Sequence, residues 1–196
     1  MQILSSRFHY DTPQSLAGCL LVASPSWEHA DFQKAVCLVV HHSPQGAVGV
    51  ILNRTLPFDD KLLWKVMGHK KKQAQPGRLH LGGPNSGPVV AMHQREDLAE
   101  FVSGEGVYFA AQAHHLKSLI ADTDRKWKIF VGQATWEAGS LEQQFSQGCW
   151  LPIEVSRQVV FADVDLVWPL AVRQVGNRMV QCLTGAIQPP SSPLMN

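Results

Sequence analysis

The sequence predicts a single-domain α+β protein built on a mixed but mainly antiparallel β-sheet. A length of 196 residues fits one domain of ordinary size, and the 45% of hydrophobic residues can fill a complete core. Residues 36–40 and 47–52 are two runs of strand-forming residues around a Ser-Pro-Gln-Gly break, a pattern typical of a β-hairpin. Further short strands follow with mostly short links, and adjacent hairpins favour antiparallel pairing within an α+β fold.

This hairpin is expected at the centre of the sheet. Apolar residues occupy successive positions over residues 36–40, where a half-exposed strand would show them at alternate positions. Strands of this composition are usually covered on both faces. We therefore expect the rest of the chain to pack against the hairpin.

The other elements are predicted in chain order. Alternation over residues 126–131 places Trp127, Ile129 and Val131 on one side, as in a half-exposed strand. In the last helix, Pro169 is tolerable only near a first turn. Strands are expected at 16–23, 79–81, 89–93, 107–110, 126–131 and 149–155, and helices at 59–67, 112–121, 139–147, 157–162 and 165–175.

The two ends of the chain differ from its middle. Residues 1–15 are polar and mixed, and are expected to form a loosely attached arm before a domain at 16–187. The Pro/Ser-rich residues 188–196 are expected to be disordered. The start lacks the charged and apolar regions of a signal peptide, and no apolar run approaches the ~20 residues of a membrane span. We expect a soluble, cytoplasmic protein with no membrane contact.

Charge and cysteine content predict neither a nucleic-acid surface nor a metal site. The formal net charge is +1, and the one basic run, Lys70 to Lys72, lies in a polar stretch that is typical of a solvated loop. None of the four cysteines has CxxC spacing, and three of them lie in apolar runs, as buried hydrophobic residues do. Adjacent residues on a strand point to opposite faces, so His41 and His42 cannot share a metal. No motif predicts a cofactor.

The loop at residues 82–88 is the most unusual local feature of the sequence. Three glycines and two prolines there permit two interpretations. Successive N–H groups of residues 82–87 can form an anion-binding nest, or the loop is a strand connection that needs glycine at positive φ. It matches no phosphate-binding signature. His93 ends the next strand, either as a half-buried structural histidine or as an acid/base group.

Two further places offer polar or aromatic groups. Asn53 and Arg54 close the central hairpin, where Arg54 can hold an anion or the pair can cap the end of the sheet. Trp136 and Trp150 flank the predicted helix at 139–147, where large aromatic residues form either core or a ligand platform. No GxSxG elbow is present for nucleophilic catalysis.

Several different short motifs follow one another along the chain in a definite order. They are residues 16–23 with Pro25, Asp31, Phe32, Val36, His42, residues 46–50, Asn53 and Arg54; Gly82, Gly83, Pro84 and His93; and Trp136, Gly139, Leu141, Glu142, Trp150, Leu151, Phe161, Trp168 and Gly176. Together they resemble the bacterial AlgH/YqgE family over about residues 16–176. The chain departs from the family pattern at Asn85, where Val is usual, at Ser140, where Gln is usual, and at Gln144, where Glu is common.

The resemblance implies a curled, mainly antiparallel sheet flanked by helices, and it implies no reaction. The family is often labelled as transcriptional regulators, with an undefined biochemical role. The net charge of +1 and the lack of a helix-turn-helix or basic helix oppose direct DNA binding. Any regulatory effect is therefore expected to be indirect.

Two functions are open at this point. The first is a non-enzymatic regulator that binds an unknown protein partner or a small anion. The second is an enzyme acting on a small molecule or nucleotide, with His93 as acid/base beside the loop at 82–87. The candidate ligand or partner surface consists of Asn53, Arg54, Gly82, Gly83, Pro84, His93, Trp136 and Glu142.

Overall fold

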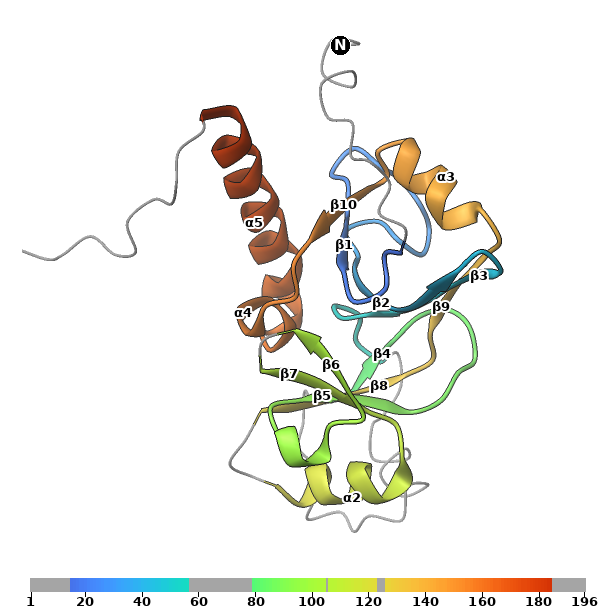
Figure 1. The fold of residues 1–196 in the computed structure, drawn as a ribbon, viewed down its shortest axis with the longest axis vertical. Helices are drawn as coiled ribbons and strands as arrows, with labels where there is room; N and C mark the ends of the chain where they lie inside the picture. Colours follow the sequence, from blue (N-terminus) through green and yellow to red (C-terminus); the bar gives the residue numbers. More distant parts are fainter. Residues whose placement is uncertain (1–14, 57–78, 105, 123–125, 185–196) are drawn as a thin grey trace, which may run out of the picture.

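The computed structural model describes residues 15–56, 79–104, 106–122 and 126–184 (Figure 1). The predicted helix at 59–67 and the basic run at 70–72 lie outside these residues. So do residues 1–14 of the expected arm and the expected tail at 188–196.

The strands form two five-stranded sheets. Sheet A is antiparallel throughout, and sheet B is antiparallel except for the parallel pair β4 and β8. In spatial order, sheet A contains β10 (Trp150–Ile153), β1 (Leu20–Ala23), β2 (Val36–Ser43), β3 (Gly46–Ile51) and β9 (Ala134–Glu137). Sheet B contains β4 (Leu79–Leu81), β8 (Trp127–Val131), β5 (Val90–His93), β7 (Val107–Ala110) and β6 (Phe101–Gly104). The predicted α+β fold with mixed but mainly antiparallel strands is confirmed, with the strands divided between two sheets.

Helices lie in layers around the sheets, as Figure 1 shows. α2 (Ala113–Ala121) packs on the outer face of sheet B, and α3 (Ser140–Ser146) packs on the outer face of sheet A. α4 (Arg157–Val160) and α5 (Val164–Thr184) contribute to the core between the two sheets. A short 3-10 turn, η2 (Glu96–Leu98), precedes β6.

The central hairpin lies where the sequence predicts it. β2 is the third of five strands in sheet A, and its first four residues are buried. Leu38 points into the core between the sheets, whereas Cys37 and Val39 belong to the core under α3. Both faces of β2 are covered, and this explains its continuous apolar run.

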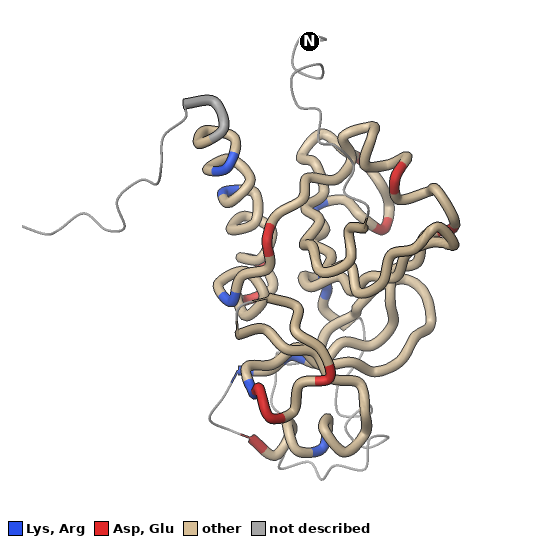
Figure 2. The backbone as a smooth tube through the Cα atoms, in the orientation of Figure 1, with Lys and Arg blue, Asp and Glu red and all other residues tan. Residues whose placement is uncertain are grey.

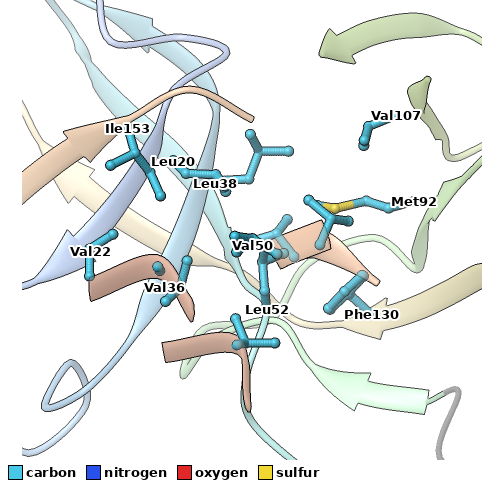
Figure 3. Close-up of a cluster of buried hydrophobic side chains, with 14 of the residues drawn as sticks. Leu20, Val22, Val36, Leu38, Val50, Leu52, Met92, Val107, Phe130 and Ile153 are labelled. Atoms are coloured by element: carbon cyan, nitrogen blue, oxygen red, sulfur yellow. The ribbon is translucent and has the colours of Figure 1, made fainter. Parts of the chain in front are cut away.

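The inner core joins the two sheets (Figure 3). Leu38 and Val50 of sheet A meet Met92 and Phe130 of sheet B there, and all four are buried. Burial of one such side chain contributes about 1.5–3 kcal/mol. The sheets are therefore held together by packing over the whole width of the inner core.

Strand β8 corrects one prediction. We expected one face of this strand to be exposed. On the face opposite Trp127 and Ile129, however, Lys128 is only 7% exposed and Phe130 is fully buried. β8 lies between β4 and β5, and its second face packs into the inner core. The Lys128 ammonium donates to the Ala162 carbonyl at the end of α4, so this buried cation has an acceptor.

Helix α5 corrects a second prediction. Pro169 lies inside a helix of 21 residues, beyond its first turn. Its missing N–H would have bonded the Asp165 carbonyl near the start of the helix. Val167, Ala171 and Val175 are buried at four-residue spacing. The packing of this helix face stabilises the helix despite the hydrogen bond that is missing at Pro169.

Candidate functional site

The loop at 82–88 lies against the turn between β8 and β9. The Gly82 N–H donates to the Val131 carbonyl at 2.8 Å, and the Gly82 carbonyl accepts the Ile51 N–H at 2.7 Å. Asn85 exchanges two backbone hydrogen bonds with Gln133, at 3.0 and 2.9 Å. The N–H groups of Gly82 and Asn85 are therefore occupied within the protein and cannot bind an anion.

Close backbone contact explains the two adjacent glycines. A Cβ at Gly82 would lie 2.3 Å from the Gly132 carbonyl oxygen, and a Cβ at Gly83 would lie 2.2 Å from the Gln133 carbonyl carbon. Gly83 also has a φ of +157°. These features fit the strand-connection interpretation of the loop. Pro84 follows as an exposed residue.

Asn53 and Arg54 hold the segment that leads into β2. Asn53 Oδ1 accepts the Val36 N–H at 2.9 Å, and its Nδ2 donates to the Lys34 carbonyl at 2.8 Å. Arg54 Nη2 donates to the Gln33 carbonyl at 2.6 Å. Burial lowers the pKa of the Arg54 guanidinium from its ordinary value, against an opposing effect of Asp31. Both side chains thus cap the sheet end and bind backbone carbonyls or amides.

His42 and Glu142 connect β2 to α3. His42 Nδ1 accepts the Leu16 N–H at 2.9 Å, so the ring proton is placed on Nε2, which lies 3.0 Å from Glu142 Oε1. The His42 side chain is buried, and that of Glu142 is half-buried. Both nitrogens of His42 are engaged, so it is not available as a general base in this arrangement.

Trp136 belongs to an aromatic cluster under α3. The indole N–H groups of Trp136 and Trp150 both donate to Gln144 Oε1, at 3.0 and 2.9 Å. Phe32 stacks on Trp136 with 5.5 Å between ring centroids. Trp136, Trp150 and Phe32 are all buried, so they form core. The amide oxygen of Gln144 is the shared acceptor of the two indoles.

His93 is buried in sheet B. Its side chain has 0% exposure, and Nδ1 accepts the Arg95 N–H at 3.2 Å. Nε2 is buried without a hydrogen-bond partner among the residues that the structure describes. Burial lowers the pKa of His93 to about 4, outweighing the Arg95 hydrogen bond. The ring is neutral at physiological pH and shielded from solvent.

The predicted site residues fall into three separate places. Backbone hydrogen bonds join the hairpin end to the β4 region, since the Leu81 N–H donates to the Arg54 carbonyl at 3.0 Å. Trp136 and Glu142 lie on the α3 side of sheet A. His93 ends β5 in sheet B, where its register partners are Tyr108 and Trp127. The residues do not converge on one site.

Sequence reasoning missed the role of Glu100. Its Oε1 accepts the N–H groups of Ala111 and Gln112 at 3.0 and 2.8 Å, at the start of α2, and lies 2.9 Å from His115 Nδ1. Burial raises the pKa of Glu100, but the hydrogen bonds from Gln112, His115 and Ala111 outweigh it and lower the pKa overall. No residue spacing in the sequence predicts this helix cap, because Glu100 lies one β-hairpin before the helix.

A second missed pair lies in sheet B. His80 is 1% exposed, and neither of its ring nitrogens has a hydrogen-bond partner in the described part of the chain. Burial first, and then Lys128, lower the pKa of His80 to about 4. Burial lowers the pKa of Lys128 to about 8, with Asp163 opposing this effect. Sheet B therefore carries several buried titratable groups.

Within the described ranges, no group of three His, Cys, Asp or Glu side chains is arranged to hold a metal ion. No helix in those ranges has both the length and the apolar character to cross a membrane.

Known proteins resemble this chain over most of its length. Solved structures of AlgH from Pseudomonas aeruginosa and of a Corynebacterium diphtheriae protein superpose with TM-scores of 0.63 and 0.59, each at 24% identity. The first covers 91% of this chain and 98% of that one, and the second covers 81% and 86%. A UPF0301 protein of Pelodictyon phaeoclathratiforme is 31% identical over 82% of this chain and 87% of its own length. The AlgH-like family profile matches residues 20–180, and the chain belongs to that family.

Proposed function

We propose that this protein is a non-enzymatic cytoplasmic regulator that acts by contacting a protein partner and does not bind DNA directly. One observation carries the proposal: the polar side chains of the family-like motifs are bonded to the protein itself. Asn53 and Arg54 bind backbone groups, and His42 binds Glu142 and the Leu16 amide. These residues build a scaffold, which leaves recognition to its surface.

The same geometry favours a protein partner over a small anion. The donors that would hold an anion are those of the glycine loop and Arg54. The N–H groups of Gly82 and Asn85 and the Arg54 guanidinium already donate to carbonyl oxygens. An anion that took these donors would have to break those bonds, and each carbonyl oxygen left buried without a donor costs about 1–3 kcal/mol.

The distribution of charge supports an indirect regulatory role. Figure 2 shows the Lys and Arg residues of the described chain scattered over separate elements and interspersed with Asp and Glu. The net charge is +1 over the whole sequence. Direct DNA binding usually requires several basic groups along one face.

The enzyme alternative depends on His93. An acid/base group must reach the reacting atom at about 2.6–3.2 Å. His93 is fully buried, and one of its nitrogens already accepts a backbone N–H. No feature of the described residues around it favours catalysis.

A ligand screen separates the two functions. The thermal unfolding temperatures of the full chain and of its His93→Gln variant are measured in the presence of nucleotides and phosphorylated metabolites. In parallel, the tagged full chain is used to capture proteins from bacterial extract. A ligand at 100 times its Kd would stabilise the fold by about 2.7 kcal/mol. We expect no small-molecule shift and a stoichiometric protein partner. A nucleotide or metabolite shift that His93→Gln abolishes would overturn the proposal.

A further inference from the structure

Strand β6 is an exposed apolar edge. It is the outer strand of sheet B, with β7 on its inner side. Val102 is 66% exposed and Phe101 is 37% exposed, two of the four large apolar residues that are exposed in the described ranges. The four residues of β6 include no Pro and no charged residue, which are common protections of an edge strand. A bulge between Val102 and Gly104 is a protection that the described residues of β6 do show, and Val155 packs on Gly104 at the same end of the strand.

We propose that β6 pairs antiparallel with β6 of a second copy of this chain, joining two copies of sheet B into one continuous sheet. The proposal goes beyond the proposed function, because it concerns contact between copies. A two-fold axis at Val102 brings each Val102 against its copy and sets Glu100 opposite Gly104. The contact is then isologous, the usual symmetry of homodimers.

Charge complementarity favours a second copy as the occupant. The N-terminal side of β6 follows the acidic turn η2, in which Asp97 pairs with Arg95 and Glu96 is exposed. At its C-terminal side the exposed Arg157 packs on Gly106, where an added Cβ would lie 2.7 Å from Arg157 Nε. In an antiparallel contact the C-terminal end of one β6 lies beside the N-terminal end of the other. Arg157 of each copy then approaches the acidic turn of the other, at both ends of the contact.

The size of the contact sets its expected strength. β6 has four residues, so the buried area falls below the roughly 1,200 Å² of standard stable interfaces. The net charge of +1 gives little repulsion between copies. We therefore expect a weak, concentration-dependent dimer with a Kd on the order of 10–100 µM.

Sedimentation velocity of the full chain, from low micromolar to several hundred micromolar, tests the pairing. The wild-type chain should shift from monomer to dimer over this range. Val102→Lys should weaken association at least tenfold, because two lysines would face each other on the axis. The matched control is Leu166→Lys on α5, where the residue is 51% exposed, and it should leave the dimer unchanged. A thermal unfolding curve of each variant is recorded beforehand to confirm that the variant folds.

A charge swap tests the register. Arg157→Glu and Glu96→Arg should each weaken association several-fold at low salt, and the double variant should recover most of the loss. Amide hydrogen exchange at residues 101–104 should slow as protein concentration rises. The proposal is overturned if the chain stays monomeric, if Leu166→Lys breaks the dimer while Val102→Lys does not, or if β6 captures only a foreign extended peptide.

Discussion

The two sheets of this protein satisfy their polar groups to different degrees. In sheet A and its flanking segments, Asn53, Arg54 and His42 find partners within the fold, and Gln144 serves two indoles at once. In sheet B, His80 and His93 are buried with ring nitrogens that have no partner in the described chain. Unpaired buried polar groups cost stability. Among the described residues sheet A is therefore the better satisfied half, and the two buried histidines give sheet B a sensitivity to pH.

Acidification should give the largest difference between the two sheets. The pKa values of His80 and His93 fall from 6.5 to about 4 in the native state, so between these values the unfolded chain binds more protons than the folded chain. Stability is therefore retained above pH 6.5 and lost as the pH falls toward 4, by at most about 3 kcal/mol for each histidine. Urea unfolding at stepped pH measures this loss.

Two variants sharpen that result. His80→Leu removes one of the two titrating groups, so about half of the acid-dependent loss should disappear. Val39→Ala makes a cavity in the core of sheet A and should lower stability by the same amount at every pH. An unchanged acid profile in His80→Leu would contradict the assignment of this sensitivity to sheet B.

Gly83→Ala should destabilise the contact between the glycine loop and the β8–β9 turn. The new Cβ would lie 2.2 Å from the Gln133 carbonyl carbon, which is backbone and cannot rotate away. We expect a loss of roughly 3 kcal/mol or more in the free energy of unfolding. Gly139→Ala is the matched control. Gly139 has φ +76° with nothing within 4 Å of an added Cβ, so about 1 kcal/mol is expected. Equal losses in the two variants would mean that the loop can shift.

Asn53→Ala tests whether the motif supports the fold. The change leaves the Val36 N–H and the Lys34 carbonyl without their side-chain partner. A loss of about 1–3 kcal/mol follows, measured by chemical denaturation. Asn53→Asp keeps the acceptor for the Val36 N–H but sets a carboxylate oxygen against the Lys34 carbonyl, so it should not restore the wild-type stability. Near-wild-type stability in Asn53→Ala would return this residue to the candidate surface.

The sequence predicts patterns that depend on near neighbours in the chain. The continuous apolar run of β2 correctly indicates a central strand, and Asn53 follows its hairpin where a cap is needed. Lys128 misled the interpretation, because a lysine at an alternating position indicates exposure, whereas here the distant Ala162 carbonyl receives its ammonium. Glu100 was missed for the same reason, since its partners Ala111 and Gln112, just before α2, are brought to it by the β6–β7 hairpin.

The smallest expected effect comes from Gln144→Glu, which exchanges the amide shared by the two indoles for a carboxylate. A carboxylate oxygen can accept the two indole N–H groups now bonded to Gln144 Oε1. The half-buried position keeps part of the side chain near solvent. Stability should therefore change by less than about 1 kcal/mol, with the near-UV circular dichroism of Trp136 and Trp150 preserved. Gln144→Leu provides the contrast, because it removes the acceptor from both indoles and should lower stability clearly more than Gln144→Glu. If Leu is tolerated as well as Glu, ring packing alone holds the cluster, and sheet A is less dependent on satisfied polar groups than its contacts indicate.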